Sequence, residues 1–140
     1  MRLSNLADYA VVIMAEASRH CGGVRTNAAA LADTTGLPAP TVQKLVSKLT
    51  GAGLLRSMRG AGGGLQLARP AAAITLADIV EAVEGPIALT ACLDSDDCAV
   101  DHSCAVKPHW PMVNAALRGA LADISLARLA HTDTRMKEPA

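Results

Sequence analysis

Residues 40–67 read PTVQKLVSKLTGAGLLRSMRGAGGGLQL, and this stretch decides the fold. Its first part, about 40–51, carries apolar residues at the i, i+3, i+4, i+7 spacing of one helical face, namely Val42, Leu45, Val46 and Leu49. Gly53 is well placed to end this helix. Two short strand-like runs then flank a glycine-rich tip, a pattern typical of a β-hairpin. The stretch therefore predicts a helix followed directly by a hairpin.

A second helical pattern, about 27–34, precedes this helix and stops at Gly36. A helix, a short turn that holds a glycine and a second helix form the outline of a helix-turn-helix. A hairpin directly behind such a unit is the wing of a winged helix. A further amphipathic helix over about 4–20 leads into the unit. We therefore expect a DNA-binding part over 1–70.

The remainder of the chain also has mainly helical patterns. Thr75 and Asp78 have the spacing of a capping box, and the helix that they begin runs to a Gly-Pro break at 85–86. A loop rich in Asp and Cys covers 90–106, and a last helix with an apolar face covers 108–127. In so small a domain, such a helix needs a partner, most simply a second copy of the chain. We therefore expect a homodimer.

A chain of 140 residues with 51% apolar residues is long enough for one domain with its own core. We place this single domain at 1–130 and a flexible tail at 131–140. The expected fold class is mainly α with a small β-hairpin: a winged helix-turn-helix plus a long C-terminal dimerisation helix. No run of about 18 apolar residues occurs, so we expect a cytoplasmic protein with no membrane partner.

Charge is unevenly distributed along the sequence, although the formal net charge is zero. Residues 1–70 hold eight Lys or Arg against three acidic residues, whereas 71–106 hold seven acidic residues and no basic ones. The first half thus carries the positive field that duplex DNA requires. Aromatic residues make up only 1% of the chain, which argues against a stacking platform for single-stranded nucleic acid. We expect a double-stranded DNA operator as the partner.

Candidate DNA contacts lie on the polar face of the helix over 40–51, at Thr41, Gln43, Lys44, Ser47 and Lys48. Gln43 is able to bond adenine edges in the major groove, while the two lysines can reach guanine or phosphate. Arg59, at the tip of the wing, suits a narrow and electronegative minor groove. Gly60 beside it permits close approach of the backbone.

Cys92, Cys98 and Cys104 are evenly spaced on the acidic loop, in a C-x5-C-x5-C pattern. Three thiolates on one loop can converge on a single site for a soft metal. The fourth cysteine, Cys21, lies far away in the sequence, so a fourth ligand must come from elsewhere. The spacing alone leaves a zinc site and a metal-free thiol sensor open.

Nothing in the sequence indicates an enzyme. The glycine-rich tip lacks the Lys of a phosphate-binding loop, and no nucleophile–base pair stands out. The adjacent carboxylates of Asp96 and Asp97 lie in a polar loop. We expect no catalytic residues and no small-molecule substrate.

The sequence resembles the IscR-type winged-helix transcription regulators, which carry an iron–sulfur cluster, from Met1 to about Leu129. The resemblance rests on the three cysteines and on the segments MRLS (1–4), DYA (8–10), LVSKL (45–49), RGAGGG (59–64), LARP (67–70) and ITLADIVEAVEG (74–85). Two further segments, EGPIALTAC (84–92) and PHWP (108–111), make it most similar to the branch that regulates the SUF iron–sulfur assembly genes.

This resemblance implies a cluster, [2Fe–2S] or [4Fe–4S], held by the three loop cysteines. The fourth ligand of IscR itself is a His three residues after the last cysteine, but Lys107 occupies that position here. A protonated ammonium does not coordinate a metal. Asp8 matches an aspartate that a nitric-oxide-sensing branch supplies from the partner subunit, and His109 is the alternative. His102, a thiol or water are further options.

We therefore expect a sequence-specific transcription regulator, a repressor, that senses iron–sulfur status, redox state or nitric oxide. Cluster occupancy or oxidation state would change how the cysteine loop packs on the dimer helix and on the DNA-binding helices. This population shift would bias the half-site spacing. Two alternatives remain. One is a zinc- or thiol-based redox regulator on the same fold, and the other is an iron–sulfur carrier that does not bind DNA.

Overall fold

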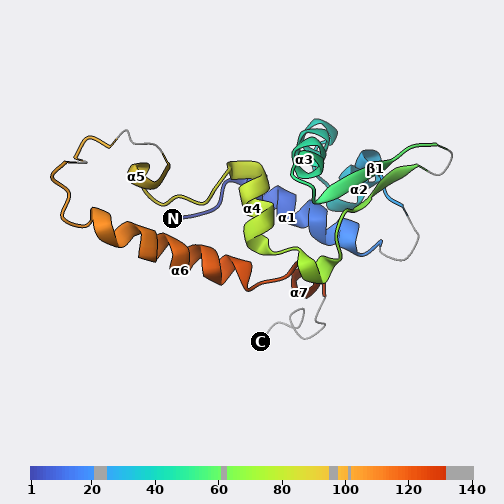
Figure 1. Cartoon of the computed structure of the whole chain (residues 1–140). Helices are drawn as coiled ribbons and strands as arrows, with labels where there is room; N and C mark the ends of the chain where they lie inside the picture. The colour runs from blue at the N-terminus through green and yellow to red at the C-terminus, as the bar shows by residue number, and fades with distance from the viewer. Residues whose placement is uncertain (21–24, 61–62, 95–97, 101, 132–140) are drawn as a thin grey trace, which may run out of the picture.

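The computed structural model describes residues 1–20, 25–60, 63–94, 98–100 and 102–131. Along the chain it contains α1 (Asn5–Ser18), α2 (Ala28–Thr35), α3 (Ala39–Gly51), β1 (Leu55–Met58), β2 (Gly64–Leu67), the 3-10 turn η1 (Ala71–Ala73), α4 (Leu76–Glu84), α5 (Ala91–Asp94), the 3-10 turn η2 (Lys107–His109), α6 (Trp110–Ala122) and α7 (Leu126–Ala130) (Figure 1). The first three helices begin and end within two residues of the predicted bounds. The prediction of a mainly α fold with one small hairpin is confirmed.

Helix α1 lies at the centre of the molecule, where it contacts α2, α3, α4, α7 and β2. The largest fully buried side chains form one core around it: Ile13, Met14, Leu31, Val42, Leu45, Leu49, Leu54, Leu55, Ile74, Ile79 and Leu126. Helix α6 extends away from this body, with the α5 loop beyond its first turn (Figure 1). None of its residues is buried in the single chain.

The turn between α2 and α3 is set by local chemistry. The side chain of Asn27 caps α2 by accepting a hydrogen bond from the Ala30 N–H at 2.8 Å. Gly36 ends α2 in the left-handed conformation, at φ +75°, which favours glycine. Pro40 stands in the first turn of α3, where its missing N–H leaves no helical bond unmade. The helix-turn-helix therefore forms as the sequence predicts.

The wing is an antiparallel pair of β1 and β2, in which Arg56 lies opposite Gln66. At its tip Gly60 has φ +98°, a conformation that side-chain-bearing residues rarely adopt. At the start of β2, where Gly64 pairs with Met58, a Cβ at Gly64 would collide with the carbonyl oxygen of Thr26, which forms an isolated bridge with the neighbouring Leu65. The glycines thus serve the hairpin geometry.

The capping box at the start of α4 is confirmed, since the Thr75 hydroxyl accepts from the Asp78 N–H and the Asp78 carboxylate accepts from the Thr75 N–H. Helix α4 then runs to Glu84, before the Gly-Pro break. Its inner face, with Ile79 and Val80, is buried. Among the described residues no helix is long and apolar enough to span a bilayer.

The prediction of one continuous helix over 108–127 is wrong. Helix α6 ends at Ala122, and Ser125 caps a separate helix, α7, by accepting from the Arg128 N–H. The cause is tertiary: the Leu76 N–H donates to Ile124 O at 2.8 Å, and the Leu126 N–H donates to Ile74 O at 2.7 Å. These bonds turn the chain and bury Leu126 in the core.

Two further expectations concern the cysteine loop and the C-terminal tail. The loop over 90–106 holds the short helix α5. Of the predicted flexible tail over 131–140, only His131 lies within the described residues.

Replacing Leu126 with Ala should lower the free energy of unfolding by about 2–5 kcal/mol, because truncating a fully buried leucine leaves a cavity. Leu129, in the same helix, is 36% exposed and is the matched control. Its replacement by Ala should have a clearly smaller effect. Urea unfolding at one fixed protein concentration measures both. Equal losses in the two variants would contradict this packing of α7.

Candidate functional site

The predicted recognition helix is α3, and its polar face is open to solvent. Gln43, Lys44, Ser47 and Lys48 are exposed, and Thr41 is partly exposed. The opposite face carries the buried residues Val42, Leu45 and Leu49. Packing of the apolar face thus presents the predicted DNA contacts outward.

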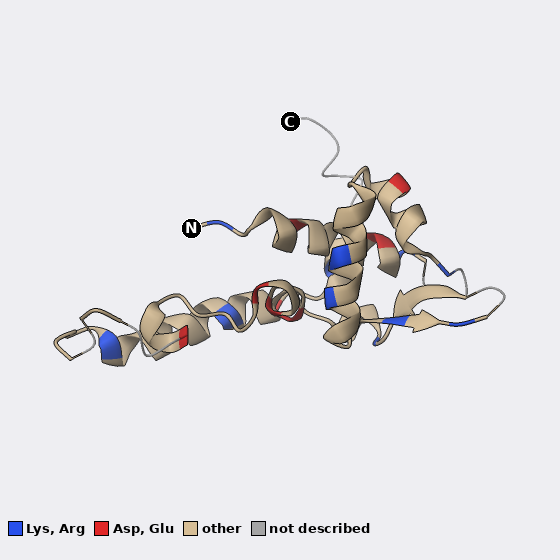
Figure 2. Ribbon diagram, turned by 90° about the horizontal axis from the view of Figure 1, so that it is seen from above, with Lys and Arg blue, Asp and Glu red and all other residues tan. Residues whose placement is uncertain are grey.

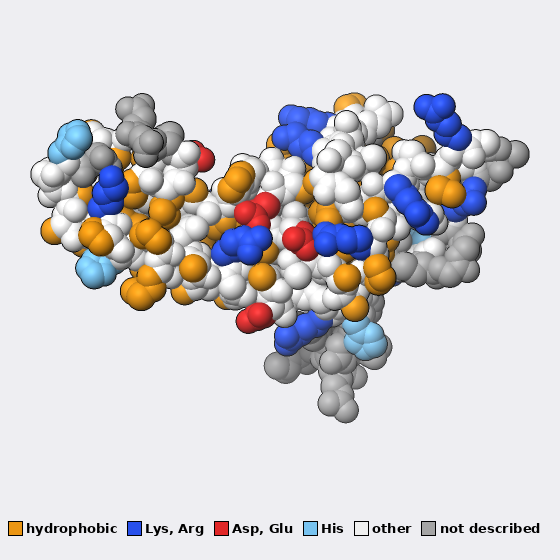
Figure 3. All heavy atoms as spheres, in the orientation of Figure 1, with side chains coloured by type: hydrophobic (Ala, Val, Ile, Leu, Met, Phe, Trp, Pro, Cys, Tyr) orange, Lys and Arg blue, Asp and Glu red, His pale blue; other side chains and the backbone are white. Residues whose placement is uncertain are grey.

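Arg59 and Gly60 are exposed at the tip of the wing, directly after β1. Lys and Arg residues lie along α3 and the wing in the ribbon view (Figure 2), and Lys and Arg side chains lie over this region, as well as elsewhere, in the space-filling view (Figure 3). The acidic residues of the neighbouring α4 are Asp78, Glu81 and Glu84. Four of the eight basic residues of the first half lie on α3 and the wing: Lys44, Lys48, Arg56 and Arg59.

One contact of the recognition helix is not foreseen from the sequence. The Nζ of Lys48 donates to Val83 O, near the end of α4, at 3.4 Å. A lysine near the last carbonyls of a helix is favourable because the helix dipole makes that end negative. This bond links α3 to the last turn of α4.

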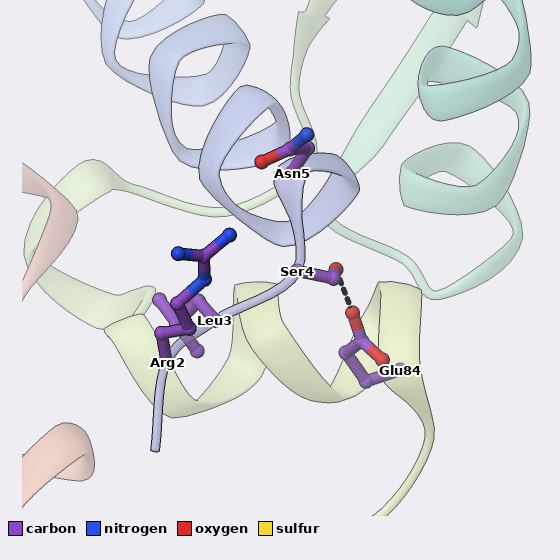
Figure 4. A pocket seen from close by; sticks show the side chains of 5 residues that line it. All are labelled: Arg2, Leu3, Ser4, Asn5 and Glu84. Atoms are coloured by element: carbon purple, nitrogen blue, oxygen red, sulfur yellow. Dashed lines mark hydrogen bonds between the residues drawn. The ribbon is translucent and has the colours of Figure 1, made fainter.

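The same end of α4 also contacts the N-terminus of α1. The Ser4 hydroxyl donates to the Glu84 carboxylate and also caps α1 by accepting from the Ala7 N–H at 3.1 Å. The two residues lie in an open hollow of about 510 Å³, lined with Arg2, Leu3 and Asn5 as well (Figure 4). The last turn of α4 is therefore in contact with both α3 and Ser4, the residue that caps α1.

The three loop cysteines line one small cavity. Cys92 lies on α5, Cys98 follows α5 in the chain, and Cys104 precedes η2. Together with Thr90, Val100, Lys107 and Trp110 they enclose about 160 Å³. All three cysteines are partly buried and none forms a disulfide. The fold thus brings thiols that are twelve positions apart in sequence to one place.

The chemistry of this cavity suits a soft metal or cluster. Three sulfur donors line one small, largely apolar cavity, and the Thr90 hydroxyl lies 3.0 Å from the Cys92 sulfur. A hydroxyl at that distance can donate to a thiolate and stabilise its charge. Within the described parts of the chain, no three His, Cys, Asp or Glu side chains lie close enough together to hold a metal ion.

Neither candidate for the fourth ligand lines the cavity within one chain. Asp8 is exposed in the first turn of α1, and His109 is exposed at the end of η2. Lys107 and Trp110, the neighbours of His109, line the cavity instead. His102 is also exposed, and Cys21 lies outside the described residues.

An ion pair on the outer side of α4 joins it to α6. Arg118 lies 2.7 Å from Glu81, and the hydrogen bond and negative charge of Glu81 raise the pKa of the Arg118 guanidinium above its ordinary value. The sequence gives little signal for this pair, since the two residues lie far apart along the chain.

The sequence profile of the Rrf2 family, described as an iron-dependent transcriptional regulator, matches residues 3–132. The chain belongs to the Rrf2 family. The regulator CymR of Bacillus subtilis is 34% identical over 95% of this chain and 93% of its own. The regulator IscR of Photorhabdus laumondii is 30% identical over 92% of this chain and 79% of its own. Both are described as HTH-type transcriptional regulators.

Solved structures of family members have the same fold. CymR of B. subtilis, described as the global cysteine regulator, superposes with a TM-score of 0.76 at 32% identity, over 95% of this chain and 99% of that one. IscR of T. potens superposes with a TM-score of 0.74 at 26% identity, over 100% and 93%. The chain is thus a helix-turn-helix transcription regulator of the Rrf2 family and not an enzyme. It is similar to both the IscR and the CymR members, so the comparisons do not single out the SUF branch.

Proposed function

We propose that the chain is a homodimeric, cytoplasmic repressor whose DNA binding depends on an iron–sulfur cluster held by Cys92, Cys98 and Cys104. The observation that carries this proposal is the single cavity that the three thiols line. Thiolates are the ligands of iron–sulfur clusters in proteins, and a sheltered site protects such a cluster from solvent. The similarity to IscR members of the family supports it further.

In this proposal the cysteine cavity is the sensor, and α3 and the wing bind the operator DNA. A bound cluster supplies a group that is sensitive to redox state, nitric oxide and iron supply. Cys92, Cys98 and Cys104 would hold it, and the Thr90 hydroxyl, 3.0 Å from the Cys92 sulfur, would donate a hydrogen bond to that sulfur as a thiolate. Lys107, at the cavity wall, places a positive charge near the anionic sulfur set.

A ligand from a second chain completes the site. Asp8 of the partner is the best candidate because it matches the aspartate of the nitric-oxide-sensing branch, and His109 remains the alternative. A ligand that crosses the subunit boundary ties the cluster directly to dimer geometry. The first helix, which would offer it, packs against α3.

Helix α6 is the proposed dimer contact. Met112 is 68% exposed and Val113 is 40% exposed in the single chain, and apolar side chains lie along this helix (Figure 3). Two copies of α6 packed together would remove this surface from water. Two recognition helices related by a two-fold axis would read the two half-sites of a palindromic operator.

On DNA, we assign Gln43 and Lys44 to base edges in the major groove, with Thr41 and Ser47 beside them, and Lys48 to the phosphate backbone. Arg59 enters the minor groove, and Gly60 allows the backbone to approach it. The segments 84–92 and 108–111 support SUF iron–sulfur assembly genes as the targets, sensed through iron–sulfur status, redox state or nitric oxide.

A zinc- or thiol-based regulator is the second candidate function. It is favoured by the 34% identity to CymR, whose solved structure is described as that of a global cysteine regulator. In this case the same three thiols would bind zinc or react directly. An iron–sulfur carrier without DNA binding finds no support, because the relatives are HTH-type transcriptional regulators.

The DNA contacts are testable on a duplex that the protein itself selects from a random library. Arg59→Ala should weaken binding to this duplex by about 1–3 kcal/mol, because it removes a minor-groove contact. Lys48→Ala should weaken all duplexes alike and lower the slope of log K against log salt by about one. Arg128→Ala, an exposed arginine on α7, is the control and should change neither. Unchanged affinity in the Arg59 variant, or loss at a single base position in the Lys48 variant, would contradict these roles.

The ligand set is testable on protein purified without oxygen. Wild-type protein should be brown and contain iron and sulfide, and each single replacement of Cys92, Cys98 or Cys104 by Ala should abolish or destabilise the cluster. Cys21→Ala is the control and should retain it. A colourless protein with one zinc per chain would support the zinc regulator instead.

The fourth ligand follows from the same preparation. Asp8→Ala should change the absorption spectrum and the lifetime of the cluster in air more than His109→Ala does, because a carboxylate is a hard, weak donor at the labile corner of the site. If the His109 variant loses iron and the Asp8 variant keeps the wild-type spectrum, the ligand set is three cysteines and a histidine of the same chain.

A further inference from the structure

The segment 85–90, which joins α4 to the cysteine loop, is held from both sides by side chains. The Ile87 N–H donates to the Glu81 carboxylate at 3.1 Å. The Ile87 carbonyl accepts from the Asn114 amide at 2.8 Å, and the Leu89 N–H donates to the oxygen of the same amide at 3.0 Å. Three backbone groups of this irregular segment thus find partners on the two helices beside it.

The Asn114 side chain pairs with the backbone of this segment in the way that a neighbouring strand would. Its amide N–H donates to the carbonyl of Ile87, and its amide oxygen accepts from the N–H of Leu89. No other uncharged side chain of this size carries both groups side by side. The assigned orientation of the amide is the only one that fits, since the reverse would place oxygen against oxygen and N–H against N–H.

Glu81 joins the segment to both helices at once. One carboxylate oxygen accepts from the Arg118 guanidinium, with Nε at 2.9 Å and Nη2 at 2.7 Å, and the other oxygen accepts from Ile87. The side chain of Arg118 is 48% exposed, so this ion pair contributes little to stability by itself. The two partly buried bonds of Asn114 are therefore the main restraint.

This clamp, formed by Glu81, Asn114 and Arg118, lies between the cysteine cavity and the DNA-binding face. On one side, Leu89 is followed by Thr90, whose hydroxyl touches the Cys92 sulfur. On the other side, α4 ends at Val83 and Glu84, which contact Lys48 of α3 and Ser4 before α1 (Figure 4). The clamp is the described link that fixes the first cysteine relative to α4 and α6.

We propose that Asn114, supported by the Glu81–Arg118 pair, is a positioning residue that sets the place of Cys92 in the cysteine cavity. This role of Asn114 rests on the proposed function, because the cavity is the proposed sensor. Loss of the clamp lets segment 85–90 move, and with it Thr90 and Cys92, whereas Cys104 lies outside this segment, before η2.

The test uses full-length protein without metal, so that it does not depend on what the cysteines bind. In Asn114→Ala, the Leu89 amide should exchange with solvent about tenfold faster by NMR, because its acceptor is gone. Alkylation of Cys92 by iodoacetamide should rise about threefold relative to Cys104, read by mass spectrometry of the two peptides. Asp123→Ala, an exposed polar residue at the end of the same helix, is the control and should leave both rates unchanged.

A graded variant separates positioning from general loosening. Asn114→Asp keeps the acceptor for Leu89 and loses the donor to Ile87, so both rates should fall between those of wild type and Asn114→Ala. Unchanged Leu89 exchange, or equal acceleration of Cys92 and Cys104, would overturn the assignment. Absence of a cluster from the wild-type protein would refute the proposed function. It would not affect the test of Asn114, because that test uses metal-free protein.

Discussion

The backbone pairing of Ile74–Leu76 with Ile124–Leu126 is the constraint on which the rest of the structure depends. Helix α6 buries none of its own residues within the chain, so its place depends on its polar contacts with α4 and segment 85–90 and on the anchor at its C-terminal end. At its C-terminal end, the bonds from Leu76 to Ile124 and from Leu126 to Ile74 return the chain to the core. Helix α7 then packs against α1 and η1. This anchor, together with the Arg118–Glu81 pair and the bonds of Asn114 to segment 85–90, places α6 and the start of the cysteine loop relative to the core.

Helix α4 transmits that constraint to the DNA-binding face. Its inner residues are buried in the core, and its acidic residues each have a partner: Asp78 with Arg69, Glu81 with Arg118 and Glu84 with Ser4. Negative charge close to a DNA-binding surface repels phosphate, and pairing reduces that repulsion. The acidic run of the sequence is therefore compatible with a basic face over α3 and the wing (Figure 2).

The parts of the fold that rest on local signals were predictable. The helical spacing in 40–51, Gly36 and the capping box of α4 were each sufficient to place an element. The break after Ala122 was not, because Ile124 continues the apolar stripe of α6 and only burial of Leu126 decides against a continuous helix. Ser125, an N-cap residue, was the one local sign of it.

The candidate site likewise has parts that the sequence predicts and parts that it does not. The even spacing of the cysteines predicts a common site, and the fold places all three on one cavity. The fourth ligand does not follow from the sequence, because Lys107 occupies the position of the expected histidine and a ligand from a second subunit has no signal in one sequence. Asn114 was also missed, although a single Asn on the apolar stripe of α6 is a sign that a buried backbone group needs a partner.

The central claim is that the state of the cysteine cavity controls the DNA-binding face. The most direct measurement is the affinity of one protein preparation for one selected duplex at fixed salt, before and after the cluster is removed without oxygen. Coupling between the two sites predicts a change of about tenfold or more, within the usual range for linked sites. The same affinity with and without the cluster would contradict it.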